Sequence, residues 1–127
     1  MSGINKIERA RRILEESLGD LIVDLQVNFF SPRLVILVRD GTRIYIRYND
    51  HDQYTYSFVF SASEGDKCLF DNYDDRWAVR TRPHHFHSRF RAHTSASPMK
   101  GNLEEDILLL CKLFLTGQLQ LRDLRFD

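Results

Sequence analysis

The sequence predicts an α+β domain in which an antiparallel meander of five to six strands is covered on one face by an N-terminal and a C-terminal helix. Two segments, one near each end of the chain, have apolar residues at helical spacing. The middle of the chain consists of short runs of β-branched and aromatic residues that are separated by turn-forming residues. Helices at both ends of a strand meander are typical of an α+β domain.

The first helix is predicted over residues 4–18. Apolar residues recur there on one stripe with charged residues opposite, and Gly19 stands where the helix would end. The pattern indicates an amphipathic helix, whose apolar stripe consists of Ile4, Ile7, Ala10, Leu14 and Leu18.

Four antiparallel strands are predicted between residues 20 and 60. In the third of them, apolar residues alternate with Arg43, Tyr45 and Arg47, which gives the sheet one dry face and one basic face that a ligand can reach. The four segments read DLIVDLQVNFF, RLVILVR, RIYIRY and YTYSFVF.

The segments at 67–73 and 76–82 are predicted to form the fifth and sixth strands, after which the chain leaves the end of the sheet. Residues 92–101 are small, polar and rich in turn formers, so we expect a mobile loop that acts as a flap.

The last helix is predicted to begin at Asn102, because Glu105 follows at the spacing of a capping box, and to end at Gly117. The tail at 118–126 fits either a short strand or a second helical piece. The buried stripe of the helix is expected to consist of Leu103, Ile107, Leu110, Cys111 and Phe114.

Size and composition indicate one cytoplasmic domain spanning residues 1–127. No apolar run approaches the ~20 residues that span a bilayer, and the start of the chain lacks a secretory signal. The 18 basic and 18 acidic side chains balance, which removes any argument for nucleic-acid binding from bulk charge. Cys68 and Cys111 lie in separate apolar segments and are expected to be buried thiols.

The segment RPHHFH at 82–87 carries three of the chain's five histidines. Between residues 76 and 91 there are also five arginines and no carboxylate. Pro83 favours an extended backbone, so His85 and His87 are expected to share one side, with His84 opposite. The segment therefore has the composition of a candidate acid–base site.

This composition suits cleavage of RNA through attack by its own 2′-hydroxyl, which needs a proton acceptor and a proton donor but no metal or other cofactor. His85 and His87 would exchange protons, and Asp71 or Asn72 would set the tautomer of an imidazole. Arginines would hold the phosphate and aromatic rings would stack on a base. The expected substrate contacts are Arg80, Arg82, Arg89 and Tyr73, with Trp77 or Phe86 as further stacking candidates.

Three other interpretations remain open. The segment fits a hydrogen-bonded surface turn, or a noncatalytic module that binds RNA or a protein. A metal site formed by His84, His85, His87 and Asp71 is ranked lower, because the spacing matches no established zinc pattern and the nearby arginines oppose a divalent cation.

The motifs FDN at 70–72 and PHHFH at 83–87, in this order before a closing helix, resemble the TumE family of prokaryotic toxins from toxin–antitoxin pairs. The resemblance implies a toxin that acts on RNA and is neutralised by a small helix-turn-helix antitoxin. The oligomeric state is left open, with a homodimer among the options. The positions that the resemblance carries over are Asp71, Asn72, His84, His85 and His87.

Overall fold

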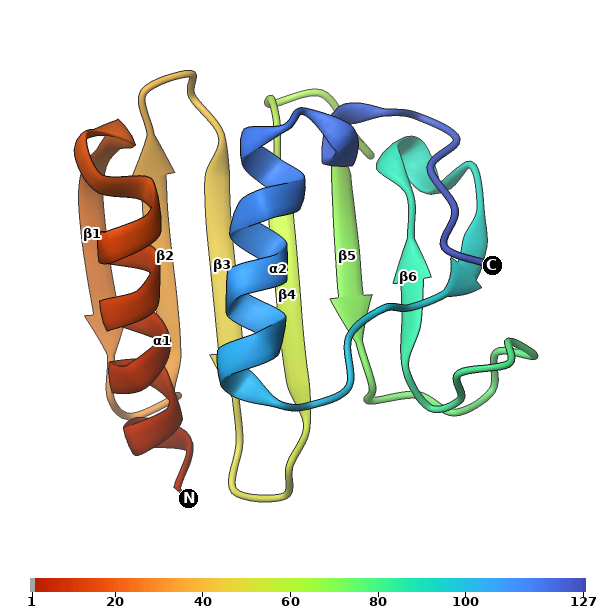
Figure 1. Cartoon of the computed structure of the whole chain (residues 1–127), viewed down its shortest axis with the longest axis horizontal. Coiled ribbons are helices and arrows are strands. Elements are labelled where there is room, and N and C mark those ends of the chain that lie inside the picture. Colours follow the sequence, from red (N-terminus) through yellow and green to blue (C-terminus); the bar gives the residue numbers. More distant parts are fainter. Residues whose placement is uncertain (1) are drawn as a thin grey trace.

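The computed structural model describes residues 2–127 and contains one antiparallel sheet whose strands follow one another in chain order from β1 to β7 (Figure 1). The two helices, α1 (Gly3–Leu18) and α2 (Leu103–Leu115), lie side by side on one face of this sheet. The predicted α+β meander is confirmed, with seven strands in place of five to six. The strands are β1 (Ile22–Asn28), β2 (Arg33–Val38), β3 (Arg43–Tyr48), β4 (Tyr54–Val59), β5 (Lys67–Asp71), β6 (His85–His87) and β7 (Thr94–Ala96).

Three short 3-10 turns complete the chain, at Gly19–Leu21, Arg89–Arg91 and Gln118–Gln120. The last of these resolves the ambiguous tail as a helical piece, after which Phe126 packs on Phe70 and Phe86. None of the helices among residues 2–127 combines the length and the apolar character that crossing a bilayer requires.

The core lies between the sheet and the helices, because every second residue of β2 to β5 is apolar and points to the helical side. In β3 the predicted alternation is confirmed, with Ile44, Ile46 and Tyr48 buried and Arg43 and Arg47 exposed on the other side. No helix among residues 2–127 covers that other side, and we call it the open face. Both cysteines are buried free thiols, as predicted.

The helix ends follow the predicted signals. The side chain of Asn102 accepts a hydrogen bond from the Glu105 backbone N–H at 3.1 Å, which caps α2. Beyond α2, Gly117 adopts a left-handed conformation with a φ of 76°, and the chain turns away.

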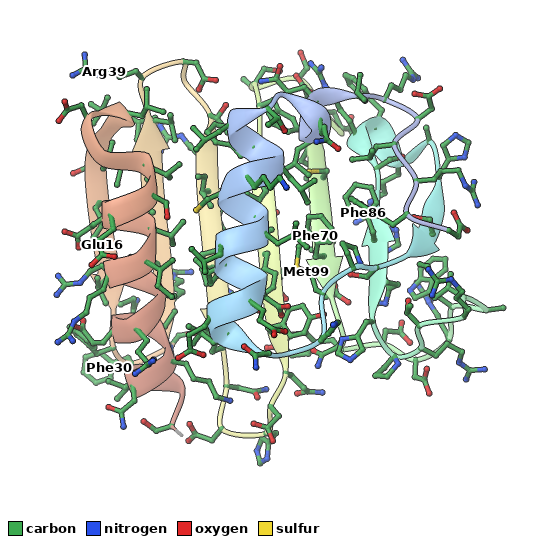
Figure 2. All side chains as sticks on the ribbon, in the orientation of Figure 1. Glu16, Phe30, Arg39, Phe70, Phe86 and Met99 are labelled. Carbon is green, nitrogen blue, oxygen red and sulfur yellow. The ribbon has the colours of Figure 1, made fainter. Side chains whose placement is uncertain are left out.

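The predicted sixth strand at 76–82 is wrong, because the strand beside β5 is the histidine segment itself. Its central residue, Phe86, is wholly buried beside Phe70 (Figure 2), with the two ring centroids 4.5 Å apart. The segment 76–82 has three arginines and little to bury, and it forms tight backbone turns instead of a ladder.

The predicted mobile flap at 92–101 is also wrong. Residues 94–96 form the edge strand β7 against β6, and Ser95, Ser97 and Met99 are buried. Their backbone groups have partners, since the Ser97 N–H donates to Thr81 Oγ1 at 2.9 Å. The small polar residues that suggest a loop here allow close packing and satisfy the buried backbone.

Candidate functional site

His85 and His87 lie on the open face, because alternate residues of β6 point to the same side of the sheet. Their ring centroids are 5.0 Å apart and the rings meet edge to face at 82°. The predicted grouping of these two imidazoles is therefore present, and we call them the histidine pair.

Both ring nitrogens of His85 face acceptors. Nε2 lies 2.8 Å from Asp71 Oδ1, on the neighbouring strand position of β5, and Nδ1 donates to the Pro83 carbonyl at 3.0 Å. Burial opposes the charged form, since the residue is 1% exposed, but the hydrogen bonds to Asp71 and Pro83 outweigh it and raise the pKa of His85. The protein thus favours the imidazolium form of His85 more than water does.

His87 has the opposite character. Burial, followed by the positive charges of His85 and Arg91, lowers the pKa of His87 to about 4. Nδ1 lies 3.1 Å from Thr94 Oγ1 on β7, and Nε2 has no hydrogen-bond partner in the described part of the chain. The single buried and unpartnered side-chain nitrogen or oxygen among residues 2–127 is Arg11 Nε, so Nε2 of His87 keeps some contact with solvent. The neutral ring therefore has a nitrogen able to accept a proton.

Trp77 limits access to the histidine pair. Its ring lies 4.9 Å from the His87 ring and 5.9 Å from the His85 ring, measured between centroids. It belongs to the irregular segment between β5 and β6, which extends beyond the sheet (Figure 1). This segment and the sheet together cover His87, which is only 6% exposed.

The pKa of His87 predicts how stability depends on pH. Between pH 6.5 and about 4 the unfolded chain takes up a proton at this residue that the folded protein does not. The free energy of unfolding therefore falls by up to about 3 kcal/mol as the pH falls through this window. The raised pKa of His85 has the opposite effect on stability. Its contribution to the free energy of unfolding is complete below pH 6.5 and is lost as the pH rises through the pKa of His85 in the folded protein.

We therefore expect the His87→Asn variant to lose less stability than the wild type between about pH 7 and about pH 4.5, with thermal unfolding followed by circular dichroism. Equal losses in the two proteins would contradict the burial of a neutral imidazole at this position.

His84 lies on the helical side of the sheet, away from the histidine pair. Its Nδ1 is 2.8 Å from the Tyr54 hydroxyl, and burial lowers its pKa. Tyr54 stacks on Tyr56, whose hydroxyl donates to the buried carboxylate of Asp106 at 3.1 Å. His84 thus joins a network beneath the start of α2, which sequence reasoning missed because its members come from β4, the segment before β6, and α2.

Asn72 does not reach an imidazole through any hydrogen bond among residues 2–127. Its Oδ1 accepts from the Tyr54 N–H at 2.9 Å and its Nδ2 donates to the Asp52 carbonyl at 3.0 Å. These bonds attach the end of β5 to the turn before β4. Asp71 and Asn72 were both expected to orient an imidazole. Asp71 contacts the ring of His85, whereas Asn72 bonds to the backbone groups of Tyr54 and Asp52.

A comparison with models of protein families matches the family described as Toxin TumE over residues 6–111, most of the chain. The chain belongs to the TumE family. The matched range includes the histidine pair and Asp71, and membership of a toxin family implies an antitoxin partner. Neither a search of curated proteins nor a search of solved structures gave a match.

Of the three arginines expected to contact substrate in this TumE-family chain, Arg89 is the most constrained. Its Nη2 lies 3.3 Å from Oδ2 of the buried Asp66, and its Nη1 donates to the Gln120 carbonyl. Arg82 pairs with Asp75 at 2.9 Å, and Arg80 donates to the Phe126 carbonyl at 3.3 Å. Arg82 and Arg80 are exposed, so both remain accessible to a ligand.

Two of the expected aromatic contacts, Tyr73 and Phe86, also differ in how accessible they are to a ligand. Tyr73 is exposed in the segment after β5, whereas Phe86 is buried in the core of the TumE domain and offers no surface for stacking. Tyr73 can meet a ligand and Phe86 cannot.

The arrangement of possible metal donors also bears on the TumE site. No group of three or more His, Cys, Asp or Glu side chains among residues 2–127 is placed to hold a metal ion. His84 lies on one side of the sheet and His85 and His87 on the other, which separates the ligands of the proposed His84, His85, His87 and Asp71 set.

Proposed function

We propose that this toxin acts in the cytoplasm as a metal-independent endoribonuclease with the histidine pair at its centre. The feature that supports the proposal most is the contrast within the pair, in which the pKa of His87 is lowered to about 4 and that of His85 is raised, at a centroid separation of 5.0 Å. A neutral imidazole can accept a proton, and a neighbouring imidazole with a raised pKa can place positive charge beside the phosphate.

In this scheme Nε2 of His87 takes the proton of the 2′-hydroxyl, and the 2′-oxygen attacks the neighbouring phosphorus. The bond from phosphorus to the 5′-oxygen breaks, and His87 returns the proton to that oxygen. Both N–H groups of His85 already have acceptors, Asp71 and Pro83, so we give His85 an electrostatic role toward the phosphate. The products are a 2′,3′-cyclic phosphate and a free 5′-hydroxyl.

Cations near the pair support binding of the phosphate. The charges of Arg91 and Arg76 both lower the pKa of His87, which indicates that both guanidinium groups lie near enough to the pair to attract a phosphate there.

Further exposed side chains surround the same segment. We propose Arg80, Arg82 and Tyr73 as contacts to the flanking RNA. Arg89, His84 and Asn72 would position the surrounding backbone, since their hydrogen bonds join separate elements.

The test is incubation of the purified protein with single-stranded RNA, with and without a chelator of divalent cations. We expect cleavage that the chelator leaves unchanged, with cyclic phosphate at the new ends. Cleavage that the chelator abolishes would favour a metal-dependent mechanism, and an intact RNA would contradict nuclease activity.

The low exposure of the histidine pair favours a second candidate, a noncatalytic module that binds RNA. Trp77 and the sheet leave His85 and His87 little contact with solvent, while arginines on the same face remain available. This candidate predicts salt-sensitive binding without turnover, because screening weakens contacts between arginines and phosphates. Binding of RNA that stays intact in the same incubation would support it.

For the antitoxin we propose a small helix-turn-helix protein. This proposal rests on the family resemblance, and the gene beside the toxin gene tests it: a neighbour without such a motif would contradict it.

A further inference from the structure

Two arginines lie directly opposite each other on the open face. Arg33 of β2 pairs in register with Arg47 of β3, and like charges in this position destabilise a sheet. Within residues 2–127 neither side chain forms an ion pair or a hydrogen bond to a carboxylate. Such a pair is suited to an anion that neutralises both guanidinium groups.

The register of the strands connects this arginine pair to the histidine pair. Arg47 lies opposite Thr55, Thr55 opposite Asp71, and Asp71 opposite His85. The row from Arg33 to His85 crosses four strand spacings, roughly 19 Å at about 4.8 Å per spacing. A single strand of nucleic acid a few nucleotides long covers this distance.

Few carboxylates on the open face compete for these arginines. Asp24 of β1 accepts a hydrogen bond from Gln26 Nε2 at 3.2 Å, and Asp71 faces His85. Arg43 of β3 adds a further exposed cation to the same face. The open face is therefore basic, although the charge of the whole chain is balanced.

An aromatic turn stands beside the arginine pair. Phe30 lies at the hairpin between β1 and β2 (Figure 2). It is fully exposed, and the preceding residue, Phe29, is about half exposed. The turn is fixed, since Asn28 Oδ1 accepts from the backbone N–H groups of Phe30 at 3.0 Å and Ser31 at 3.1 Å. A hollow of about 410 Å³ opens there, lined by Gln26, Val27, Asn28, Phe29, Phe30, Arg33 and Val35.

We propose that the open face is a binding track for single-stranded RNA, in which a base stacks on Phe30 and the adjoining phosphates lie on Arg33 and Arg47. An exposed aromatic ring beside cations is the usual arrangement of single-strand sites. The inference rests on the proposed function in one respect: the strand continues along the row to the histidine pair, where the bond that is cut would lie.

The probe is a labelled, 2′-O-methylated single-stranded RNA of about eight nucleotides, which binds but lacks the hydroxyl needed for cleavage. Fluorescence anisotropy gives its affinity at several salt concentrations. The double variant Arg33→Ala/Arg47→Ala should lower the slope of log affinity against log salt by about 1.4, since each phosphate contact to a single strand contributes about 0.7. Phe30→Ala should weaken binding about tenfold and leave the slope unchanged.

Matched controls come from the helical side of the protein. Arg12→Ala removes an exposed arginine of α1, and Leu108→Ala shortens an exposed apolar side chain of α2. Both should bind the probe like the wild type. Thermal unfolding of Arg33→Ala should show unchanged or slightly raised stability, because the variant relieves a repulsion between like charges.

The outcomes separate this inference from the proposed function. Binding that depends on Arg33, Arg47 and Phe30, in a protein that cleaves no RNA, supports the track and contradicts the nuclease. Cleavage with an unchanged salt slope in the double variant overturns the track alone. The track is also overturned if Phe30→Ala keeps its RNA affinity and instead prevents rescue of growth by the protein encoded beside the toxin, since the turn would then be a protein interface.

Discussion

The His87→Asn variant should cleave RNA at least about 100-fold more slowly than the wild type, the usual effect of removing a general base. The amide of Asn can replace the hydrogen bond between His87 Nδ1 and Thr94 Oγ1, but it provides no basic nitrogen at the position of Nε2. Initial rates on one RNA substrate, measured near neutral pH, give the ratio. The same variant should no longer arrest growth when it is expressed without antitoxin.

His51→Asn is the matched control, because His51 is an exposed histidine in the turn between β3 and β4, remote in sequence from the pair. It should retain wild-type activity. A His87→Asn protein that cleaves within a few-fold of the wild-type rate, with its fold intact by circular dichroism, would remove His87 from the mechanism and leave the binding module as the better assignment.

Local pattern was sufficient for most of the fold. The alternation of apolar residues located β2 to β4 and their buried face, and the Asn102 and Gly117 signals located the ends of α2. Residues 85–87 and 94–96 were missed as strands because each is only three residues long and contains no run of β-branched residues. Their conformation depends on pairing with β5 and on burial of Phe86, which are properties of the tertiary structure.

The positions of the candidate residues were predictable to a similar degree. The two-residue spacing placed His85 and His87 on one side, and an extended backbone also placed His84 opposite. The contacts of Asp71 with His85, of Thr94 with His87 and of Arg33 with Arg47 depend on strand register, which nearby sequence does not reveal. The alternation of apolar and basic residues in β3 indicated that Arg47 lies on a basic face. It did not reveal that Arg33 lies opposite Arg47.

Replacing Asp71 with Ala should lower the free energy of unfolding by about 3 kcal/mol at neutral pH, because removal of one partner leaves a buried charge or an unpaired ring nitrogen at His85. The distance of 2.8 Å to His85 Nε2 and the 1% exposure of His85 support an effect of this size. Urea denaturation followed by tryptophan fluorescence measures it, and Trp77 itself lies beside the pair and reports on the site.

A neighbouring carboxylate provides the comparison for Asp71→Ala. Asp74 pairs with the exposed Arg76 at 2.9 Å, so Asp74→Ala should change stability by less than about 1 kcal/mol. Asp71→Asn separates charge from packing, since an amide can donate to the neutral ring of His85 and keep the site filled while it no longer supports the imidazolium. The Asn variant should therefore be more stable than the Ala variant, yet its His85 should titrate at a lower pKa by NMR than in the wild type. An unchanged pKa would show that Asp71 does not hold the charge on His85, and the electrostatic role proposed for His85 would lose its basis.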